Sequence, residues 1–236
     1  MKQILILAAS ALLLIQLVNA LPHTKRESVA VAARDNPISQ DASSASSEEL
    51  SEESSEEDDP KLKLVAFTFG GMAVIAQWTL DKGSEVLKNA VKELNEIPDK
   101  DELLQANITR MSRIANENPQ LTKEEDSEYI LKLFEYLIDF STLMDDYEQM
   151  PDDSKLKIAL KTALESNGFN EFDSEFKNKI FEFAKSMERV FGEYIKEMTP
   201  AEKSKYSKLI QWYDEFKAET DKDKKLDKLG EFFDLI

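Results

Sequence analysis

After position 60, apolar side chains recur every three or four residues through most of the chain, which is the spacing that lines up one face of an α-helix. The first such stretch has no charged residue from Leu64 to Leu80, and its apolar positions continue at helical spacing to Leu94. No segment alternates apolar and polar residues over the length of a strand, so we expect no sheet. The pattern predicts an all-α fold, a bundle of about six to seven helices.

Prolines and capping residues mark where these helices should begin and end. Pro98 ends the first helix and Asn118-Pro119 the second. The pair at 151–152 is expected to begin a later helix that Asn167-Gly168 closes. Thr199 to Glu202 reads as a capping box with proline at the first helical position. The side chains expected to face inward include Leu104, Ile108, Met111, Ile114, Ile130, Leu133, Phe134, Leu137, Ile138, Met144, Leu156, Ala159, Leu160, Ala163, Leu164, Phe172, Phe176, Ile180, Phe183, Met187, Val190, Tyr194, Leu209, Ile210, Tyr213, Phe216, Leu226, Leu229, Phe233 and Ile236.

The first twenty residues have the pattern of a cleavable signal peptide. Lys2 supplies a positive charge before an apolar run, and small residues ending at Ala20 form the expected cleavage site before Leu21. Pro22 stops a helix from continuing, so we expect no membrane span here. The sequence therefore predicts a secreted, extracellular protein. Since it has no cysteine, its apolar core alone must hold the fold.

Residues 21–60 are expected to form a disordered Ser/Glu-rich acidic segment, and residues 61–236 one all-helical domain. Few aliphatic side chains occur in the segment, so burial cannot offset the entropy of ordering it. Lys25 and Arg26 form a candidate dibasic processing site, which would leave Glu27 as the new terminus. The net charge of the chain is −17, and residues 41–59 hold nine acidic residues and no basic one.

The segment also carries five serines that have glutamate two residues later, the spacing that secretory-pathway kinases recognise. These candidate phosphorylation sites are Ser46, Ser47, Ser51, Ser54 and Ser55. Five phosphates would add roughly −8 to −10 in charge. Such a cluster of oxygen ligands suits low-affinity Ca²⁺, and the alternative interpretation is an acidic, solvating tail that binds no ion.

Two further features suggest surface chemistry. Asn107-Ile108-Thr109 is a candidate N-glycosylation site at Asn107. The C-terminal region from Lys203 to Lys228 is rich in lysine, but acidic residues lie between the lysines. We therefore expect a salt-bridged, solvated surface there rather than a site for heparin-like polyanions.

The composition excludes several functional classes. The only histidine is His23, in the expected disordered segment, so the helical body lacks both histidine and cysteine. Imidazole bases, Cys or His nucleophilic triads and most zinc sites are thereby excluded from it, and no pair of carboxylates is singled out, so we expect no enzyme and no cofactor. A polyanion repels nucleic acid and anionic lipid, which favours a partner with a cationic surface.

A signal peptide, a Ser/Glu-rich stretch at 43–59 and a cysteine-free helical body together resemble the acidic salivary proteins of blood-feeding mosquitoes, of the 34-kilodalton type. The resemblance implies release in saliva and modulation of host haemostasis, inflammation or immunity by binding, and it assigns no functional residue. The leading hypothesis is a secreted, non-enzymatic binding protein. The alternatives are an extracellular carrier of hydrophobic small molecules and a calcium-binding secretory phosphoprotein.

Overall fold

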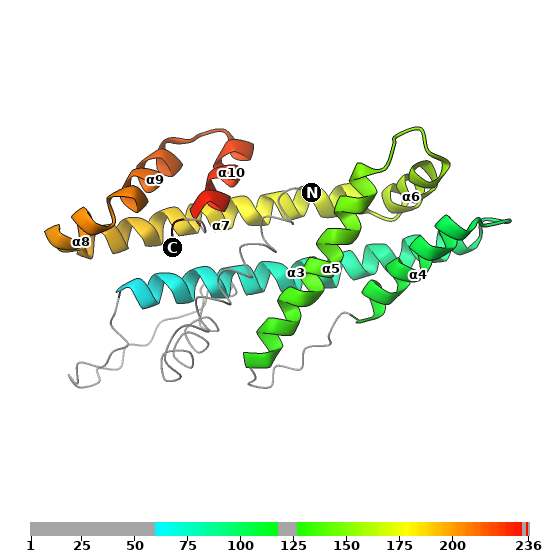
Figure 1. The fold of residues 1–236 in the computed structure, drawn as a ribbon, viewed down its shortest axis with the longest axis horizontal. Coiled ribbons are helices and arrows are strands. Elements are labelled where there is room, and N and C mark those ends of the chain that lie inside the picture. Colours follow the sequence, from blue (N-terminus) through cyan, green and yellow to red (C-terminus); the bar gives the residue numbers. More distant parts are fainter. Residues whose placement is uncertain (1–59, 118–126, 233–234, 236) are drawn as a thin grey trace, which may run out of the picture. The chain divides into compact units, whose positions relative to one another are not determined.

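The computed structural model describes residues 60–117, 127–232 and 235, and these residues form helices with no strand among them (Figure 1). The predicted all-α fold is confirmed. The predicted signal peptide, the predicted acidic segment up to residue 59, and Phe233 and Ile236, which are expected to face inward, lie outside the described residues. The helices are α3 (Pro60–Asn95), α4 (Glu102–Glu117), α5 (Ser127–Gln149), α6 (Lys155–Ser166), α7 (Phe169–Glu197), α8 (Pro200–Lys205), α9 (Ser207–Ala218) and α10 (Lys222–Phe232).

The described residues divide into two compact units. The domain boundaries expected from the sequence stay a prediction. Unit 1 comprises residues 75–117 and 127–179, and unit 2 comprises residues 60–74, 180–232 and 235. Helices α3 and α7 each contribute one part to unit 1 and another to unit 2. Helices α4, α5 and α6 belong to unit 1, and helices α8, α9 and α10 belong to unit 2.

The core of unit 1 is built on the second part of α3. Leu80, Leu87 and Leu94 recur every seven residues, and each is at most 1% exposed. Gly83 lets α5 approach closely, because a Cβ at this position would lie 2.6 Å from the ring of Phe140. Burial of side chains of this size contributes roughly 1.5–3 kcal/mol each to folding. This part of the molecule is therefore held by close apolar packing.

Helices α4 and α5 bury the faces that the periodicity predicts. On α4 the buried side chains include all four predicted ones, Leu104, Ile108, Met111 and Ile114. On α5, Leu133, Phe134, Leu137 and Met144 are buried, whereas Ile138 is half-buried. Phe140 and Leu143 are also buried, although the sequence analysis does not name them. Arg110 and Asp146 join the exposed edges of the two helices through an ion pair of 2.5 Å.

The predicted beginning of α6 is wrong by three residues. Residues 151–153 form a turn in which the backbone N of Ser154 donates to the carbonyl of Pro151 at 3.0 Å. Ser154 is the N-cap, and its hydroxyl accepts a hydrogen bond from the backbone N of Lys157 at 3.1 Å. A serine side chain satisfies a free helix-end N–H, which a proline at 151 cannot do. The predicted end is confirmed, with Asn167 as C-cap and Gly168 at φ +90°, a conformation that favours glycine.

Unit 2 is centred on an aromatic cluster around Phe191 of α7. The ring centroids of Trp212, Tyr213 and Phe232 lie 5.6, 5.1 and 6.0 Å from that of Phe191. The indole N–H of Trp212 donates to the carbonyl of Lys228 at 2.8 Å, which ties α9 to α10. These short helices are thus fixed by specific polar contacts as well as by apolar area.

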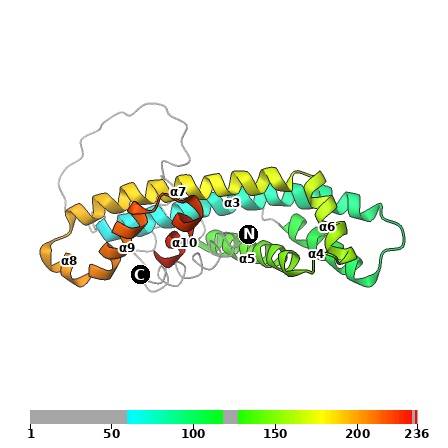
Figure 2. The ribbon, with the colours of Figure 1, turned by 90° about the horizontal axis from the view of Figure 1, so that it is seen from above.

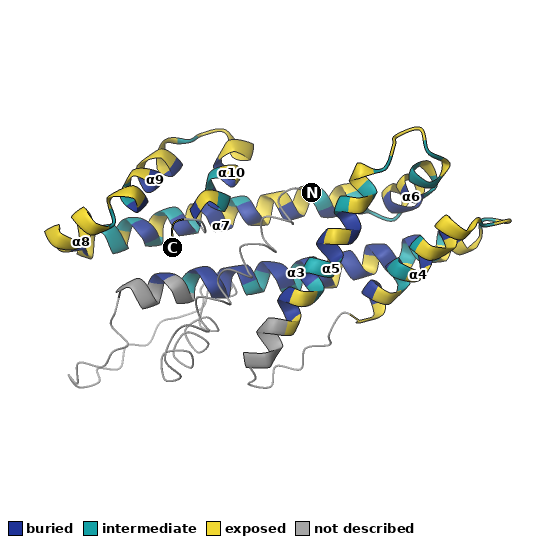
Figure 3. Ribbon diagram, in the orientation of Figure 1, coloured by how far each residue is buried: buried dark blue, intermediate teal, exposed yellow. Residues whose placement is uncertain are grey.

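The capping box at Thr199 and Glu202 is confirmed, with Pro200 at the start of the helix. The helix that begins there is shorter than predicted, however, since the chain is interrupted at Tyr206 and resumes as α9. This interruption accounts for eight helices among the described residues, where we expect six to seven. Helix α8 buries none of its side chains and is exposed along its whole length (Figure 3).

Candidate interaction surfaces

Most of the predicted modification sites lie outside the described residues. These are the five serines from Ser46 to Ser55, the cleavage site at Ala20 and Leu21, and the dibasic pair Lys25 and Arg26. Asn107 is described: it is half-buried on α4, and its side-chain Nδ2 donates to the carbonyl of Leu103 at 2.9 Å. A glycan would be attached to that nitrogen, so glycosylation of Asn107 stays a prediction.

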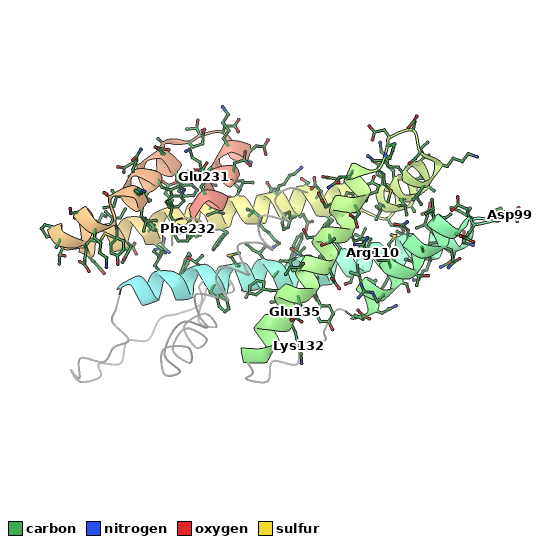
Figure 4. The ribbon with its side chains drawn as sticks, in the orientation of Figure 1. Asp99, Arg110, Lys132, Glu135, Glu231 and Phe232 are labelled. Atoms are coloured by element: carbon green, nitrogen blue, oxygen red, sulfur yellow. The ribbon has the colours of Figure 1, made fainter. Side chains whose placement is uncertain are left out.

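The charged side chains between α4 and α5 form surface ion pairs. Besides the pair at Arg110, Arg113 lies 3.3 Å from Asp139 and 3.1 Å from Glu117, and Figure 4 shows Arg110 on α4 beside α5. The hydrogen bond to Asp139, together with the negative charge of Glu117, raises the pKa of Arg113. Because these side chains are exposed, each ion pair contributes little to stability. Among the described residues, no group of three or more Asp, Glu, His or Cys has the arrangement of a metal site.

A shallow groove of about 510 Å³ lies between α3 and α4. Its lining residues are mostly polar: Val91, Asn95, Gln105, Ile108, Thr109, Ser112, Arg113, Asn116 and Glu117. Several of these polar groups bond to their own helix, as where Asn95 donates to the carbonyl of Val91 at 2.9 Å. The surface of this lining is nevertheless divided between polar and apolar atoms, and the groove is open, so it does not enclose an apolar ligand.

Lys157 secures the turn between α5 and α6. Its Nζ lies 2.9 and 2.8 Å from the carbonyls of Glu148 and Met150 and 2.7 Å from Asp152. The hydrogen bond from Lys157, and then its charge, lowers the pKa of Asp152. The lysine satisfies carbonyls at the C-terminal end of α5, where a cation is favoured. Its role is structural.

Unit 2 contains a buried lysine that the sequence analysis did not identify. Lys225 of α10 is 7% exposed, and its Nζ lies 2.7 Å from the carboxylate of Glu188 on α7 and 4.9 Å from the ring centroid of Phe216. The sequence analysis places Lys225 on a solvated surface, and this is wrong. One signal was present: Lys225, Leu229 and Phe232 are spaced by four and then three residues, so the lysine takes a position on the apolar stripe of α10.

The two units differ in net charge. The described residues of unit 1 contain 12 basic and 20 acidic side chains, a net charge of −8. Those of unit 2 contain 13 basic and 12 acidic side chains, a net charge of +1. Most of the excess negative charge of the folded part therefore belongs to unit 1, and the rest of the chain's excess belongs chiefly to residues 41–59.

Comparison with known proteins gives one result. No protein-family model, curated protein or solved structure matches this chain. Within the part of the chain that the structure describes, no helix is both long enough and apolar enough to cross a membrane. The charge distribution and the side-chain contacts are therefore the observations from which a function has to be argued.

Proposed function

We propose that the protein is a secreted, non-enzymatic binding protein that recognises the cationic surface of an extracellular protein partner. Residues 41–59 accelerate the encounter, and the acidic unit 1 makes the lasting contact. The partner belongs to a host whose response the protein modulates, as the resemblance to mosquito salivary proteins implies.

The observation that carries this proposal is the uneven distribution of charge. Nine negative charges within 19 residues, and a net charge of −8 on unit 1, create an attractive field for a positive surface. Fields of this kind raise association rates, and they contribute less to the lifetime of the complex. Unit 2, at +1, offers no such field.

The groove of unit 1 is compatible with this assignment. Its open shape and its mixed polar and apolar lining suit protein side chains better than an enclosed lipid. The carrier alternative therefore gains no support from this groove. The calcium-binding alternative depends on residues 41–59, which lie outside the described part of the chain.

The test is to compare the association kinetics of two deletion variants with those of the full mature chain. One variant lacks residues 41–59, and the control lacks residues 22–40, an equally long stretch with a net charge of +1. Each is passed over a panel of immobilised cationic extracellular proteins at several salt concentrations. At about 0.15 M salt the Debye length is near 8 Å, and at 1 M it is near 3 Å, so steering should fade across this range.

Loss of residues 41–59 should slow association and flatten its salt dependence, with little change in dissociation. The control deletion should leave both rates close to those of the full chain. If both deletions have the same effect, residues 41–59 act only as a solubilising extension. If the full chain binds no cationic protein even at low salt, the proposed class of partner is wrong.

A further inference from the structure

Three lysines at the junction of α8 and α9 lack the ion pairs that the sequence analysis expects. Lys203, Lys205 and Lys208 are exposed, and no described carboxylate lies within ion-pairing distance of them. The other lysines of the region differ, since Lys225 pairs with Glu188 and Lys228 with Glu215 at 2.9 Å. We call Lys203, Lys205 and Lys208 the lysine patch.

The carboxylate next to the lysine patch forms the cap of α8 and no ion pair with a lysine of the patch. Glu202 is the only acidic residue from 200 to 213, and its carboxylate accepts hydrogen bonds from the backbone N and the hydroxyl of Thr199 at 2.8 and 2.7 Å. These bonds form the cap of α8. These hydrogen bonds, and then the charge of Lys205, lower the pKa of Glu202, so its carboxylate stays ionised and residues 200–213 carry a net charge of +2. Lys203 and Lys205 lie on α8, which is exposed along its whole length (Figure 3), and Lys208 is exposed on the first turn of α9.

The acidic residues 41–59 join the folded chain at Pro60, in the same unit as the lysine patch. Within unit 2 the first part of α3 lies against α7, where Phe67 stacks on Phe183 at 6.2 Å and the hydroxyl of Thr68 lies 3.1 Å from the sulfur of Met187. The two helices run in opposite directions (Figures 1 and 2). The start of α3 therefore lies toward the end of α7 from which the chain enters α8.

We propose that residues 41–59 dock on the lysine patch of the same chain. The lysine patch is opposite in charge to this segment, which is attached to the same unit and contains nine acidic residues and no basic one. At about 3.3–3.6 Å per residue, 19 residues reach at most roughly 65 Å, and a short tether of this kind gives a millimolar effective concentration. Phosphorylation at Ser46, Ser47, Ser51, Ser54 and Ser55 strengthens the contact, because phosphate adds negative charge and hydrogen-bond acceptors.

This inference goes beyond the proposed function because the contact needs no partner. It also gives unit 2 a regulatory role, since a cationic partner has to compete with the lysine patch for residues 41–59. The contact can be measured in the isolated protein, so its failure and the failure of the proposed function are distinguishable.

Because the chain contains no cysteine, a single introduced cysteine can be labelled at one defined position. A single Ala45→Cys substitution in the mature chain carries a nitroxide label, and the broadening of backbone amide signals is measured by NMR. At about 0.01 M salt, where the Debye length is near 30 Å, the amides of α8 and the first turn of α9 should broaden, and at 1 M salt they should recover. Phosphorylated protein should need more salt for the same recovery.

Two charge-reversal variants decide where the segment binds. The triple variant Lys203→Glu, Lys205→Glu and Lys208→Glu should lose the broadening of α8 and α9. The control reverses Lys88, Lys92 and Lys155, three exposed lysines of unit 1, and should keep it. Circular dichroism checks that both variants remain helical. Broadening of α8 and α9 that survives the patch reversal, or that is lost equally in the control, overturns the proposal.

A second measurement separates the chain's own segment from a foreign polyanion. If residues 41–59 occupy the lysine patch, deleting them should increase the affinity of the protein for a heparin fragment, and the patch reversal should abolish that gain. Equal affinity with and without residues 41–59 overturns the proposal, because the lysine patch is then an open site for external polyanions.

Discussion

In unit 1 the buried hydroxyl of Thr79 is bonded to the carbonyl of Ile75, but those of Ser84 and Ser141 have no described hydrogen-bond partner. In unit 2 the buried polar groups of Thr68 and Lys225 are both bonded. Unit 1 relies on close helix packing, as where Gly83 meets Phe140, and keeps its ion pairs at the surface. Unit 2 attaches two short helices through a buried charge pair and bonds from side chain to backbone. Helices of 11 and 12 residues are only marginally stable alone, so α9 and α10 depend on tertiary packing, to which these contacts add.

The largest expected effect comes from the buried pair of unit 2. Lys225→Met leaves the Glu188 carboxylate, 28% exposed, beside an apolar cluster, and should lower the free energy of unfolding by about 2–4 kcal/mol. Adding Glu188→Leu removes the unpaired charge and should recover most of this loss.

In unit 1, Lys157→Met should lower the free energy of unfolding by only about 1–2 kcal/mol, because its partner Asp152 is 96% exposed and stays hydrated. Urea unfolding measures the free energy of unfolding of all three variants. If the double variant of Lys225 and Glu188 is as unstable as Lys225→Met alone, the loss does not come from an unpaired Glu188 carboxylate.

Replacing either of two glycines by alanine should change the free energy of unfolding by less, and the sign of that change can be tested. Alanine favours a helix by about 1 kcal/mol over glycine, yet Gly83→Ala should destabilise unit 1 by about 1–3 kcal/mol, because its Cβ would overlap the buried ring of Phe140. Gly192→Ala should also destabilise unit 2, since its Cβ would lie 2.5 Å from the hydroxyl oxygen of Tyr213. That hydroxyl donates to the carbonyl of Glu188 at 3.1 Å and cannot move freely.

A second substitution separates the two cases. In a Tyr213→Phe background the nearest remaining ring atom, Cζ, would lie 3.5 Å from the new Cβ, an ordinary contact. Gly192→Ala should then be neutral or stabilising by up to about 1 kcal/mol. Thermal unfolding of the four members of this cycle provides the measurement. A penalty for Gly192→Ala that is unchanged by Tyr213→Phe would show that the hydroxyl is not its cause.

The smallest predicted effect is a gain in stability. Replacing Ser84 and Ser141 by alanine removes two buried hydroxyls without described partners and should stabilise the protein by roughly 1–2 kcal/mol. The matched change in unit 2, Thr68→Val, removes a hydroxyl that is bonded to the Leu64 carbonyl at 2.8 Å, and should cost about 1 kcal/mol. Calorimetry measures the stability of the alanine variant of Ser84 and Ser141 and that of Thr68→Val. Destabilisation by both changes would mean that the serines have partners after all.

Periodicity and capping rules account for much of the fold. The buried face of α4 and the caps at Thr199 and Gly168 follow from local sequence, because each depends on neighbours within a few residues. The predicted start of α6 is wrong because a proline is compatible with the first helical turn, whereas the hydroxyl of Ser154 makes the cap. Nothing in the local sequence marks the interruption at Tyr206.

The interaction surfaces were harder to predict, because they depend on which residues tertiary packing brings together. Lys225 looks like its neighbours Lys222 and Lys224 in the sequence, and only the position of Glu188 on another helix makes it a buried pair. Lys203 likewise lacks an ion pair because the carboxylate of its neighbour Glu202 is bonded to Thr199 in the cap. The division of charge between the units needed the fold, since α3 and α7 each contribute to both.

The most direct test of the central claim is to map where a cationic partner contacts the chain. Hydrogen exchange of the full mature protein is measured by mass spectrometry with and without the tightest binder from the cationic panel, at low salt. We expect slowed exchange in unit 1, chiefly in α4 and the second part of α3, which line the groove, with no protection of α9 and α10. Protection confined to α8, α9 and α10, with unit 1 unchanged, would contradict the claim that the acidic unit is the one that binds.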